Sequence, residues 1–351
     1  MFDVNEFILK KAKELGFGDV VVLSYETNRR QVRFANNEIT IAKNWHERKV
    51  ELFVEKEKRV ASTTITELSE ENIERTLKTL LSNMKGMAPK EDYYGIAEGG
   101  PFEYKDIPET FDKAIVELDE PNEYVERAIN AALEEGGAKR VAGVLYTDHN
   151  KLYLTTSNGG VEAFDEGTGI EISVRAFIGD LESGHGTNSV RVLKKFDPES
   201  AGRKAGEIAR LARNPEQGGP EGKFDVIFDP LAFANLLSYM SFMTSAYAAE
   251  AGFSFLVNKL GQKVANKIVT LKDIGNLPNG YGTRKFDDEG VPTRETTIIE
   301  NGTFRTFLLN TSLARKYGTE TTANAGLVMP HAWNIVLEPG GTTQKRSSSA
   351  K

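Results

Sequence analysis

The chain has 351 residues, which predicts two or three domains because a typical domain holds roughly 100 to 200 residues. Its 51 acidic and 44 basic side chains give a net charge of -7. The chain therefore has no broad positive field that would attract phosphate backbones, and we do not expect nucleic acid to bind it directly. The absence of cysteine excludes disulfides, iron-sulfur clusters, thiolate zinc sites and thiol nucleophiles on this chain.

The features that would direct a chain to a membrane are missing from the sequence pattern. Asp3 and Glu6 stand where an export signal would carry positive charge. The longest uncharged run, between Asp229 and Glu250, holds too many Ser, Thr and Asn residues for a membrane span, and we expect it to form a buried core helix. We therefore expect a cytoplasmic protein without a membrane partner, and its many Lys and Glu residues are also typical of thermophiles.

The first 86 residues predict a helix, a set of antiparallel strands and a second helix. An apolar helical pattern starts after Asp3, which can form a capping box with Glu6, and it ends near Gly16. Ser69 is the expected N-cap of a second helix that runs to Met84 with one apolar face. Between these helices, alternating apolar residues predict strands at 20–23, 32–34, 39–41, 50–54 and 60–65.

Residues 122–214 repeat this order of elements. Val20 matches Val141 and Asn37 matches Asn158, an offset of 121 residues in both cases. We interpret the repeat as an internal duplication, although any two units with this order of elements resemble each other. The predicted strands of the second repeat lie around 141–146, 152–155, 170–177 and 189–192.

The pattern predicts an α+β fold with a mainly β C-terminal part. An N-terminal α+β domain (1–214) contains the two repeats, about 1–86 and 122–214, joined by an irregular linker (87–121) rich in Pro and Gly. A β-rich C-terminal domain covers 222–340, with expected strands at 224–228, 296–299 and 303–309. The atypical tail 341–351, small and polar, suggests a shortened C-terminal domain.

No local motif predicts a bound nucleotide or a metal site. The fragments around four glycines lack the third glycine of a dinucleotide loop and are expected to be turns: Gly16, Gly167, Gly184 and Gly280. The four histidines are too far apart in sequence to predict a zinc site, and a site built from distant residues stays open: His46, His149, His185 and His331. We expect His185, between two glycines, to lie in a loop.

The acidic run Asp287, Asp288 and Glu289, followed by Gly290 and by Arg294, is the most informative part of the sequence. These carboxylates could bind the amino group of a peptide, orient the metal site of a partner, or act as a general acid and base pair. They could equally cap backbone N–H groups in a tight turn. Both interpretations stay open at this point, and Asp287, Asp288, Glu289 and Arg294 are the candidate substrate-binding residues.

The segment from Phe286 to Gly326 resembles the C-terminal signature of the TldD/PmbA family, whose members were described as modulators of DNA gyrase. It shares, in the family's order, the DDEG core, Thr293-Arg294, the Glu300-Asn301-Gly302 turn and Asn324-Ala325-Gly326. The duplicated N-terminal half agrees with the layout of the family, so the resemblance covers nearly the whole chain.

In the TldD branch of this family, an HExxxH helix and a later cysteine hold zinc, and the glutamate serves as base. The matching helix here is expected at 230–248, where Ser238 and Met243 occupy the two histidine positions and Tyr239 replaces the glutamate. The chain therefore resembles the PmbA, or TldE, branch, which implies no catalytic residue, no metal ligand and no cofactor on this chain.

The resemblance implies the non-catalytic subunit of a heterodimer, or a higher complex, with a TldD-type HExxxH subunit that carries the zinc. Such a metallopeptidase complex would cleave unfolded or short peptides, and the acidic run would face the peptide. Two alternatives stay open: a peptide-binding protein or homodimer without a peptidase role, and a metal-independent hydrolase that uses Asp287 and Glu289.

Overall fold

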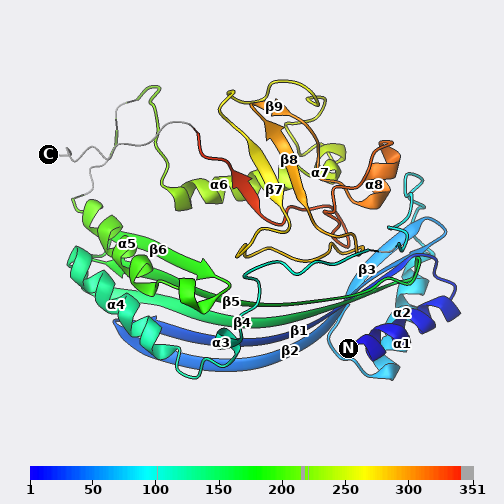
Figure 1. Cartoon of the computed structure of the whole chain (residues 1–351), viewed down its shortest axis with the longest axis horizontal. Helices are drawn as coiled ribbons and strands as arrows, with labels where there is room; N and C mark the ends of the chain where they lie inside the picture. The colour runs from blue at the N-terminus through cyan, green and yellow to red at the C-terminus, as the bar shows by residue number, and fades with distance from the viewer. Residues whose placement is uncertain (101, 215–217, 220, 341–351) are drawn as a thin grey trace.

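The computed structural model describes residues 1–100, 102–214, 218–219 and 221–340. Its main feature is a long, curved, six-stranded antiparallel sheet, and the C-terminal part of the chain lies over one face of this sheet (Figure 1). The strands lie in the order β3 (Arg59–Ile65), β2 (Glu38–Lys56), β1 (Val20–Ala35), β4 (Arg140–Thr156), β5 (Glu162–Phe177) and β6 (Ser183–Val190). The predicted α+β fold class is confirmed.

The central strands are longer than the sequence pattern predicted. The segments 20–23 and 32–34 belong to one strand of 16 residues, β1, and β2 has 19 residues. The prediction of separate short strands was wrong because polar side chains occupy the middle of the sheet. There Arg29 on β1 forms an ion pair with Asp148 on β4, so cross-strand polar contacts replace the apolar alternation.

The two repeats meet at the centre of the sheet, where β1 pairs with β4. The register of this pair places Asn28 opposite His149. These residues stand 121 positions apart, which is the offset between the repeats in the sequence. Asn28 thus lies opposite its own counterpart, as expected where a local twofold axis relates two similar units.

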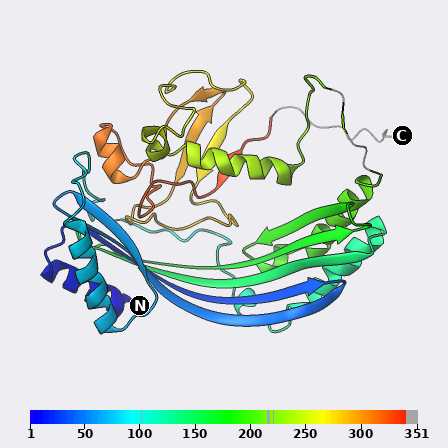
Figure 2. The same cartoon turned by 180° about the vertical axis from the view of Figure 1, so that it is seen from behind.

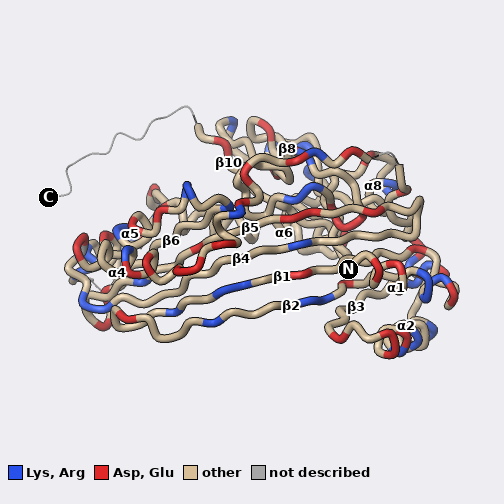
Figure 3. The backbone as a smooth tube through the Cα atoms, turned by 60° about the horizontal axis from the view of Figure 1, so that its bottom comes forward, with Lys and Arg blue, Asp and Glu red and all other residues tan. Residues whose placement is uncertain are grey.

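Two helix pairs cover the ends of the sheet (Figure 2). The helices are α1 (Phe2–Glu14) and α2 (Glu70–Met84) at one end, and α4 (Asn122–Gly136) and α5 (Pro198–Leu211) at the other. Each helix pair packs on the sheet and forms a hydrophobic core with it. β1 contributes alternate residues to both cores: Val20 and Val22 pack with α1 and α2, and Val32 and Phe34 pack with α4 and α5. Figure 3 shows acidic and basic residues interspersed along these helices.

The expected caps of the helices have mixed outcomes. The Ser69 hydroxyl accepts a hydrogen bond from the backbone N–H of Asn72 at 3.4 Å, so the predicted N-cap of α2 is confirmed. The capping box of Asp3 and Glu6 was wrong, since α1 begins at Phe2 and its N-terminus has no side-chain cap. The second repeat adds a 3₁₀ turn, η1 (Leu193–Lys195), before α5.

The linker 87–121 is irregular apart from the short helix α3 (Lys113–Val116). It runs between the sheet and the C-terminal part, and Ile96 and Ala97 are buried there. Gly99 contacts the backbone of Gly159 so closely that a Cβ atom at residue 99 would lie 2.6 Å from the carbonyl oxygen of Gly159. The connection is therefore packed against the rest of the fold around residues 96–99.

The C-terminal part contains a small sheet, three short helices and long irregular segments. The sheet order is β10 (Ile335–Leu337), β7 (Leu271–Ile274), β8 (Glu295–Glu300) and β9 (Thr303–Phe304), and the helices are α6 (Pro230–Met243), α7 (Ala246–Glu250) and α8 (Thr311–Lys316). The strand expected at 224–228 is absent, and the strand expected at 303–309 ends at Phe304. Residues 341–351, the expected atypical tail, lie outside the described residues.

The uncharged helix α6 is not a core helix, and this prediction was wrong. No residue of α6 is buried, and Tyr239 is 69% exposed. Leu237 and Met240 are partly buried against the core of the C-terminal part, but the described part of the chain leaves much of the helix uncovered. None of the described helices is long and apolar enough to cross a membrane.

Candidate functional site

The acidic segment lies where the C-terminal part packs on the sheet. Phe286, which has no exposed surface, enters a core with Val21 and Leu23 of β1 and Leu154 of β4. Gly290 follows in a left-handed conformation (φ 86°), and a Cβ atom there would lie 2.8 Å from the Val161 side chain. Only glycine fits this turn without displacing neighbours. The core anchor and the turn together fix the three carboxylates between them.

Asp287 holds the turn together. Its Oδ1 accepts the backbone N–H groups of Glu289 and Val291, both at 2.9 Å, and its Oδ2 accepts that of Ala325 at 3.0 Å. The side chain has no exposed surface. Asp287 therefore caps backbone donors, which is the structural alternative that the sequence left open.

Asp288 and Glu289 connect the turn to other parts of the chain. Asp288 accepts a charge-assisted hydrogen bond from Arg284 Nη1 at 2.9 Å and the N–H of Leu327 at 3.1 Å. Glu289 Oε2 accepts the N–H groups of Ala97 at 3.2 Å and Thr311 at 3.3 Å. Both carboxylates nevertheless line a cavity, which Asp287 does not.

Arg294, the fourth candidate, does not join this group. Its side chain is exposed and donates to the backbone carbonyl of Thr321. The structure thus brings Asp287, Asp288 and Glu289 together and leaves Arg294 on the surface.

Burial governs the ionisation of the two innermost acids. It raises the pKa of Asp287, and it raises the pKa of Glu289 as well, where the charge of Asp287 adds to the effect. Asp287 receives three backbone N–H donors and Glu289 receives two, and such donors favour the charged form. When the pair holds a single proton, we therefore assign it to Glu289.

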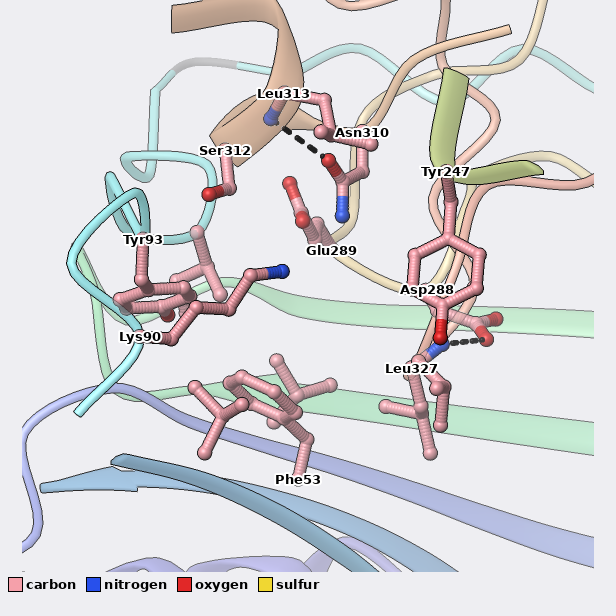
Figure 4. Close-up of a pocket in the computed structure, with 15 residues that line it drawn as sticks. Phe53, Lys90, Tyr93, Tyr247, Asp288, Glu289, Asn310, Ser312, Leu313 and Leu327 are labelled. Carbon is pink, nitrogen blue, oxygen red and sulfur yellow. Dashed lines mark hydrogen bonds between the residues drawn. The ribbon is translucent and has the colours of Figure 1, made fainter. Parts of the chain in front are cut away.

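A small cavity of about 50 Å³, the inner cavity, lies next to Glu289 (Figure 4). Its wall combines this acid with the ammonium-bearing side chain of Lys90 and with aromatic and aliphatic side chains from the sheet, the linker and the C-terminal part. The labelled lining residues are Phe53, Lys90, Tyr93, Tyr247, Asp288, Glu289, Asn310, Ser312, Leu313 and Leu327. The volume suits a single ammonium group or a few water molecules, since one water needs about 10–15 Å³ by this measure.

A larger cavity of about 420 Å³, the outer cavity, lies between β4, β5 and the C-terminal part. Its volume falls within the range of small-molecule sites, roughly 300–1,000 Å³. The ion pair of Arg284 and Asp288 separates the two cavities, because Arg284 lines the outer one and Asp288 lines the inner one. The outer lining includes Tyr25, Lys151, Asp165, Glu166, Arg191, Tyr281, Arg284, His331 and Trp333.

The histidines do not form a common site. His149 bonds to Glu166 at 2.7 Å, His46 to Asn28 at 2.8 Å, and His331 lines the outer cavity. The loop position expected for His185 was wrong, because it lies on β6 and bonds to Ser173 Oγ at 2.9 Å. Alternating glycines obscured this strand, since Gly184 and Gly186 pack directly on the backbone of α5.

Three family models match the chain in sequence order. They are PmbA/TldA metallopeptidase domain 1 at residues 20–83, the central domain at 111–213 and the C-terminal domain at 221–349. Together these three matches cover most of the chain, from the first strand to the C-terminal part. The chain belongs to the PmbA/TldD family.

Individual relatives agree with this placement. The chain is 27% identical over 297 residues to the metalloprotease PmbA of Escherichia coli O157:H7, covering 79% of this chain and 62% of that protein. It is 29% identical over 218 residues to a metalloprotease of Methanothermobacter thermautotrophicus, covering 59% and 46%. The matched region thus spans only about half to two thirds of these relatives.

Solved structures share the fold. A protein described as a modulator of DNA gyrase from Thermotoga maritima superimposes with a TM-score of 0.81 at 27% identity, covering 96% of this chain and 77% of that chain. TldE from Thermococcus kodakarensis gives a TM-score of 0.78 at 22% identity, covering 96% and 78%, which shows a common fold alone.

The residues of α6 do not fit the metal that the family name implies. Ser238, Tyr239 and Met243 stand where the HExxxH resemblance would need two ligands and a base, and the chain contains no cysteine. Within the described residues, no three His, Asp or Glu side chains are grouped so that they could hold a metal ion. We derive no catalytic step through a metal on this chain.

Several cavity residues were missed by sequence reasoning. Lys90 and Tyr93 lie in the linker, where no periodic pattern marks them, and Tyr247 lies on the short helix α7. Tyr281 was assigned to a turn only, although it lines the outer cavity. Ser312 also lines the inner cavity, and only its position within the segment that resembles the family could have pointed to a functional role.

Proposed function

We propose that this chain is a non-catalytic subunit that pairs with a TldD-type metallopeptidase subunit and guides short or unfolded peptides to it. Membership of the PmbA/TldD family supports a place in peptide processing. The observation that carries the proposal is the apolar surface around α6. The resemblance aligns this helix with the HExxxH helix, but α6 has no side chains that could bind a metal.

This apolar surface is extensive. Ile227 is 84% exposed and Tyr239 is 69% exposed. Many large apolar side chains exposed on and beside one helix are typical of a protein interaction site. The large hydrophobic side chains that form it are Phe224, Val226, Ile227, Phe228, Leu236, Tyr239, Phe242, Phe253, Phe255, Val257 and Leu260. A partner subunit that covers this surface would replace the missing layer over α6.

The inner cavity supports the guiding role. Asp288 and Glu289 both line it, together with apolar side chains such as that of Leu327. An amino group next to an apolar side chain, as at the N-terminus of a peptide, matches this combination. Binding of an ammonium group would favour the ionised form of Glu289, because the opposite charge offsets the burial that raises its pKa.

The experiment mixes the purified chain with an HExxxH-bearing family member and measures complex mass by light scattering and hydrolysis of a short unstructured peptide, with and without a chelator. We expect hydrolysis in the mixture that the chelator abolishes. The double variant Tyr239→Ser and Phe242→Ser should prevent assembly. Leu181→Ser is the matched control, because Leu181 is 81% exposed, lies between β5 and β6 and is not one of the residues that form the apolar surface around α6.

The other outcomes distinguish the alternatives. A stable homodimer that persists in the mixture, without hydrolysis, would identify a peptide-binding protein with its apolar surface covered by a second copy. Chelator-insensitive hydrolysis by the chain alone would identify a hydrolase that uses Asp287 and Glu289.

A separate variant tests the role of the acidic run. Glu289→Gln keeps the shape of the side chain, so it should leave assembly intact and lower peptide turnover. Unchanged turnover would remove Glu289 from the peptide path. Replacing Asp287 would be a poorer test, because its three backbone contacts would link folding to function.

A further inference from the structure

The outer cavity contains an arginine whose hydrogen-bonding capacity is only partly used. Arg284 donates through Nη1 to Asp288 at 2.9 Å, whereas its Nε and Nη2 are buried and have no acceptor among the described residues. Its guanidinium lies against the ring of Trp333, with 4.8 Å from Cζ to the ring centroid, and 5.9 Å from that of Phe286. Buried donors are paired in most native structures, so this edge of the guanidinium calls for an acceptor.

The acids in the same wall do not supply that acceptor, and their oxygens bond to other groups. The two oxygens of Asp165 accept the backbone N–H groups of Glu166 and Lys285, each at 2.9 Å. Glu166 bonds to His149 at 2.7 Å. The ammonium group of Lys151, by contrast, makes no hydrogen bond or ion pair within the described chain. The cavity therefore offers unpaired donors, and a ligand must bring the acceptor.

We propose that the outer cavity binds a carboxylate, with Nε and Nη2 of Arg284 as a bidentate donor pair and Lys151 as a second positive charge. Side-by-side N–H groups of arginine match the two oxygens of a carboxylate. The aromatic side chains of Tyr25, Tyr281 and Trp333 would contact the rest of the ligand. For a peptide, this assigns the C-terminal carboxylate, or an acidic side chain, to the outer cavity.

Binding requires a small movement. Arg284 is 19% exposed as a side chain, but the two unpaired nitrogens themselves are covered. Trp333 both contacts the guanidinium and lines the cavity, so we expect its indole to shift when a ligand enters. The chain has only one other tryptophan, Trp45, which lines a different pocket on the sheet. Tryptophan fluorescence can therefore report this movement.

This inference deepens the proposed function, since it names a chemical feature of the peptide, but its test uses the chain alone. In a Trp45→Phe background, three probes are titrated while Trp333 fluorescence is followed: acetyl-Gly-Leu with a free carboxylate, its C-terminal amide, and acetyl-Asp-Leu amide. We expect at least tenfold tighter binding of the free acid than of its amide. The third probe decides whether a side-chain carboxylate also binds.

Arg284→Lys should weaken binding of the free acid about tenfold and leave binding of the amide unchanged, because lysine keeps the charge next to Asp288 but loses the bidentate geometry. Arg294→Lys is the matched control, since Arg294 is exposed and lies outside the cavity lining. If thermal melting shows that Arg284→Lys is unfolded, Lys151→Met provides the test and should weaken binding of the acid several-fold.

Three results would overturn the proposal: equal affinity for acid and amide, no fluorescence change with either acid at millimolar concentration, or variants in the cavity that bind the acid like the wild type. A failure to assemble with a metallopeptidase subunit would leave a positive binding result standing. Successful assembly without carboxylate binding would remove only the outer cavity from the model of peptide guidance.

Discussion

Replacing Asp287 by alanine should destabilise the fold strongly, although the residue belongs to a run of acids that resembles a surface-exposed binding motif. The change removes the acceptor for three buried N–H groups, those of Glu289, Val291 and Ala325. Each unpaired buried donor costs about 1–3 kcal/mol, and removal of the buried carboxylate offsets part of the loss, so we expect about 3 kcal/mol of destabilisation. The urea midpoint should fall accordingly.

Asp106→Ala is the matched control for this substitution. Asp106 also forms a close contact, at 2.6 Å to Lys285 Nζ, but its side chain is 95% exposed. Loss of an exposed ion pair should leave the urea midpoint within experimental error. Hydrogen exchange provides a local readout, because the amides of residues 289, 291 and 325 should lose protection only in Asp287→Ala. Equal midpoints for the two variants, with unchanged protection at these amides, would refute the capping role of Asp287.

The remaining predictions concern ionisation and packing. Burial raises the pKa of Glu289. At pH values between the ordinary glutamate pKa and this raised pKa, the folded chain therefore binds more protons than the unfolded chain. The free energy of unfolding should fall as the pH rises through this range. Glu289→Gln should flatten the dependence of the urea midpoint on pH between 5 and 8 by up to about 1.4 kcal/mol per pH unit, and parallel curves for both proteins would contradict the assignment. Gly143→Ala should cost about 1–3 kcal/mol by overpacking, because a Cβ atom there would lie 2.1 Å from the carbonyl oxygen of Ser173. Gly86→Ala meets only ordinary contacts, 3.7 Å from Asn83, and should melt like the wild type.

The sequence predicted the order of elements in both repeats but not the extent of the strands. A hydrophobic pattern marks a strand only where its side chains are covered. In β1 this occurs at Val20 to Leu23, where both faces are buried, and at Val32 and Phe34, which lie on one buried face. Between these ends, polar pairs such as Arg29 with Asp148 maintain the sheet. A pattern based on hydrophobicity cannot detect such a segment, so one continuous strand was predicted as two.

The sequence singled out the acidic run but not the contacts that its side chains make. Asp287, Asp288 and Glu289 are adjacent in sequence, and composition alone identified the run. Their partners are distant, since Ala325 is 38 residues from Asp287, and Ala97 is 192 residues from Glu289. No local spacing encodes contacts of that range. The structural and functional interpretations of the acids could therefore be separated only after the linker and the C-terminal part had been placed against the sheet.

The chain reverses the usual distribution of side chains at two places, which are connected. Three acids are buried in the turn 287–290, and the apolar helix α6 is exposed. A groove beside α6 is lined by residues of this helix, such as Leu237, and by Ala332 and Trp333, which also line the outer cavity. Arg284, in the wall of the outer cavity, forms an ion pair with Asp288 of the acidic turn. A partner that covers α6 would thus contact the wall of the carboxylate site. If the same Trp333 indole also shifts when a peptide carboxylate binds, partner assembly and peptide binding should influence each other, and the affinity of the free acid should differ between the isolated chain and the complex.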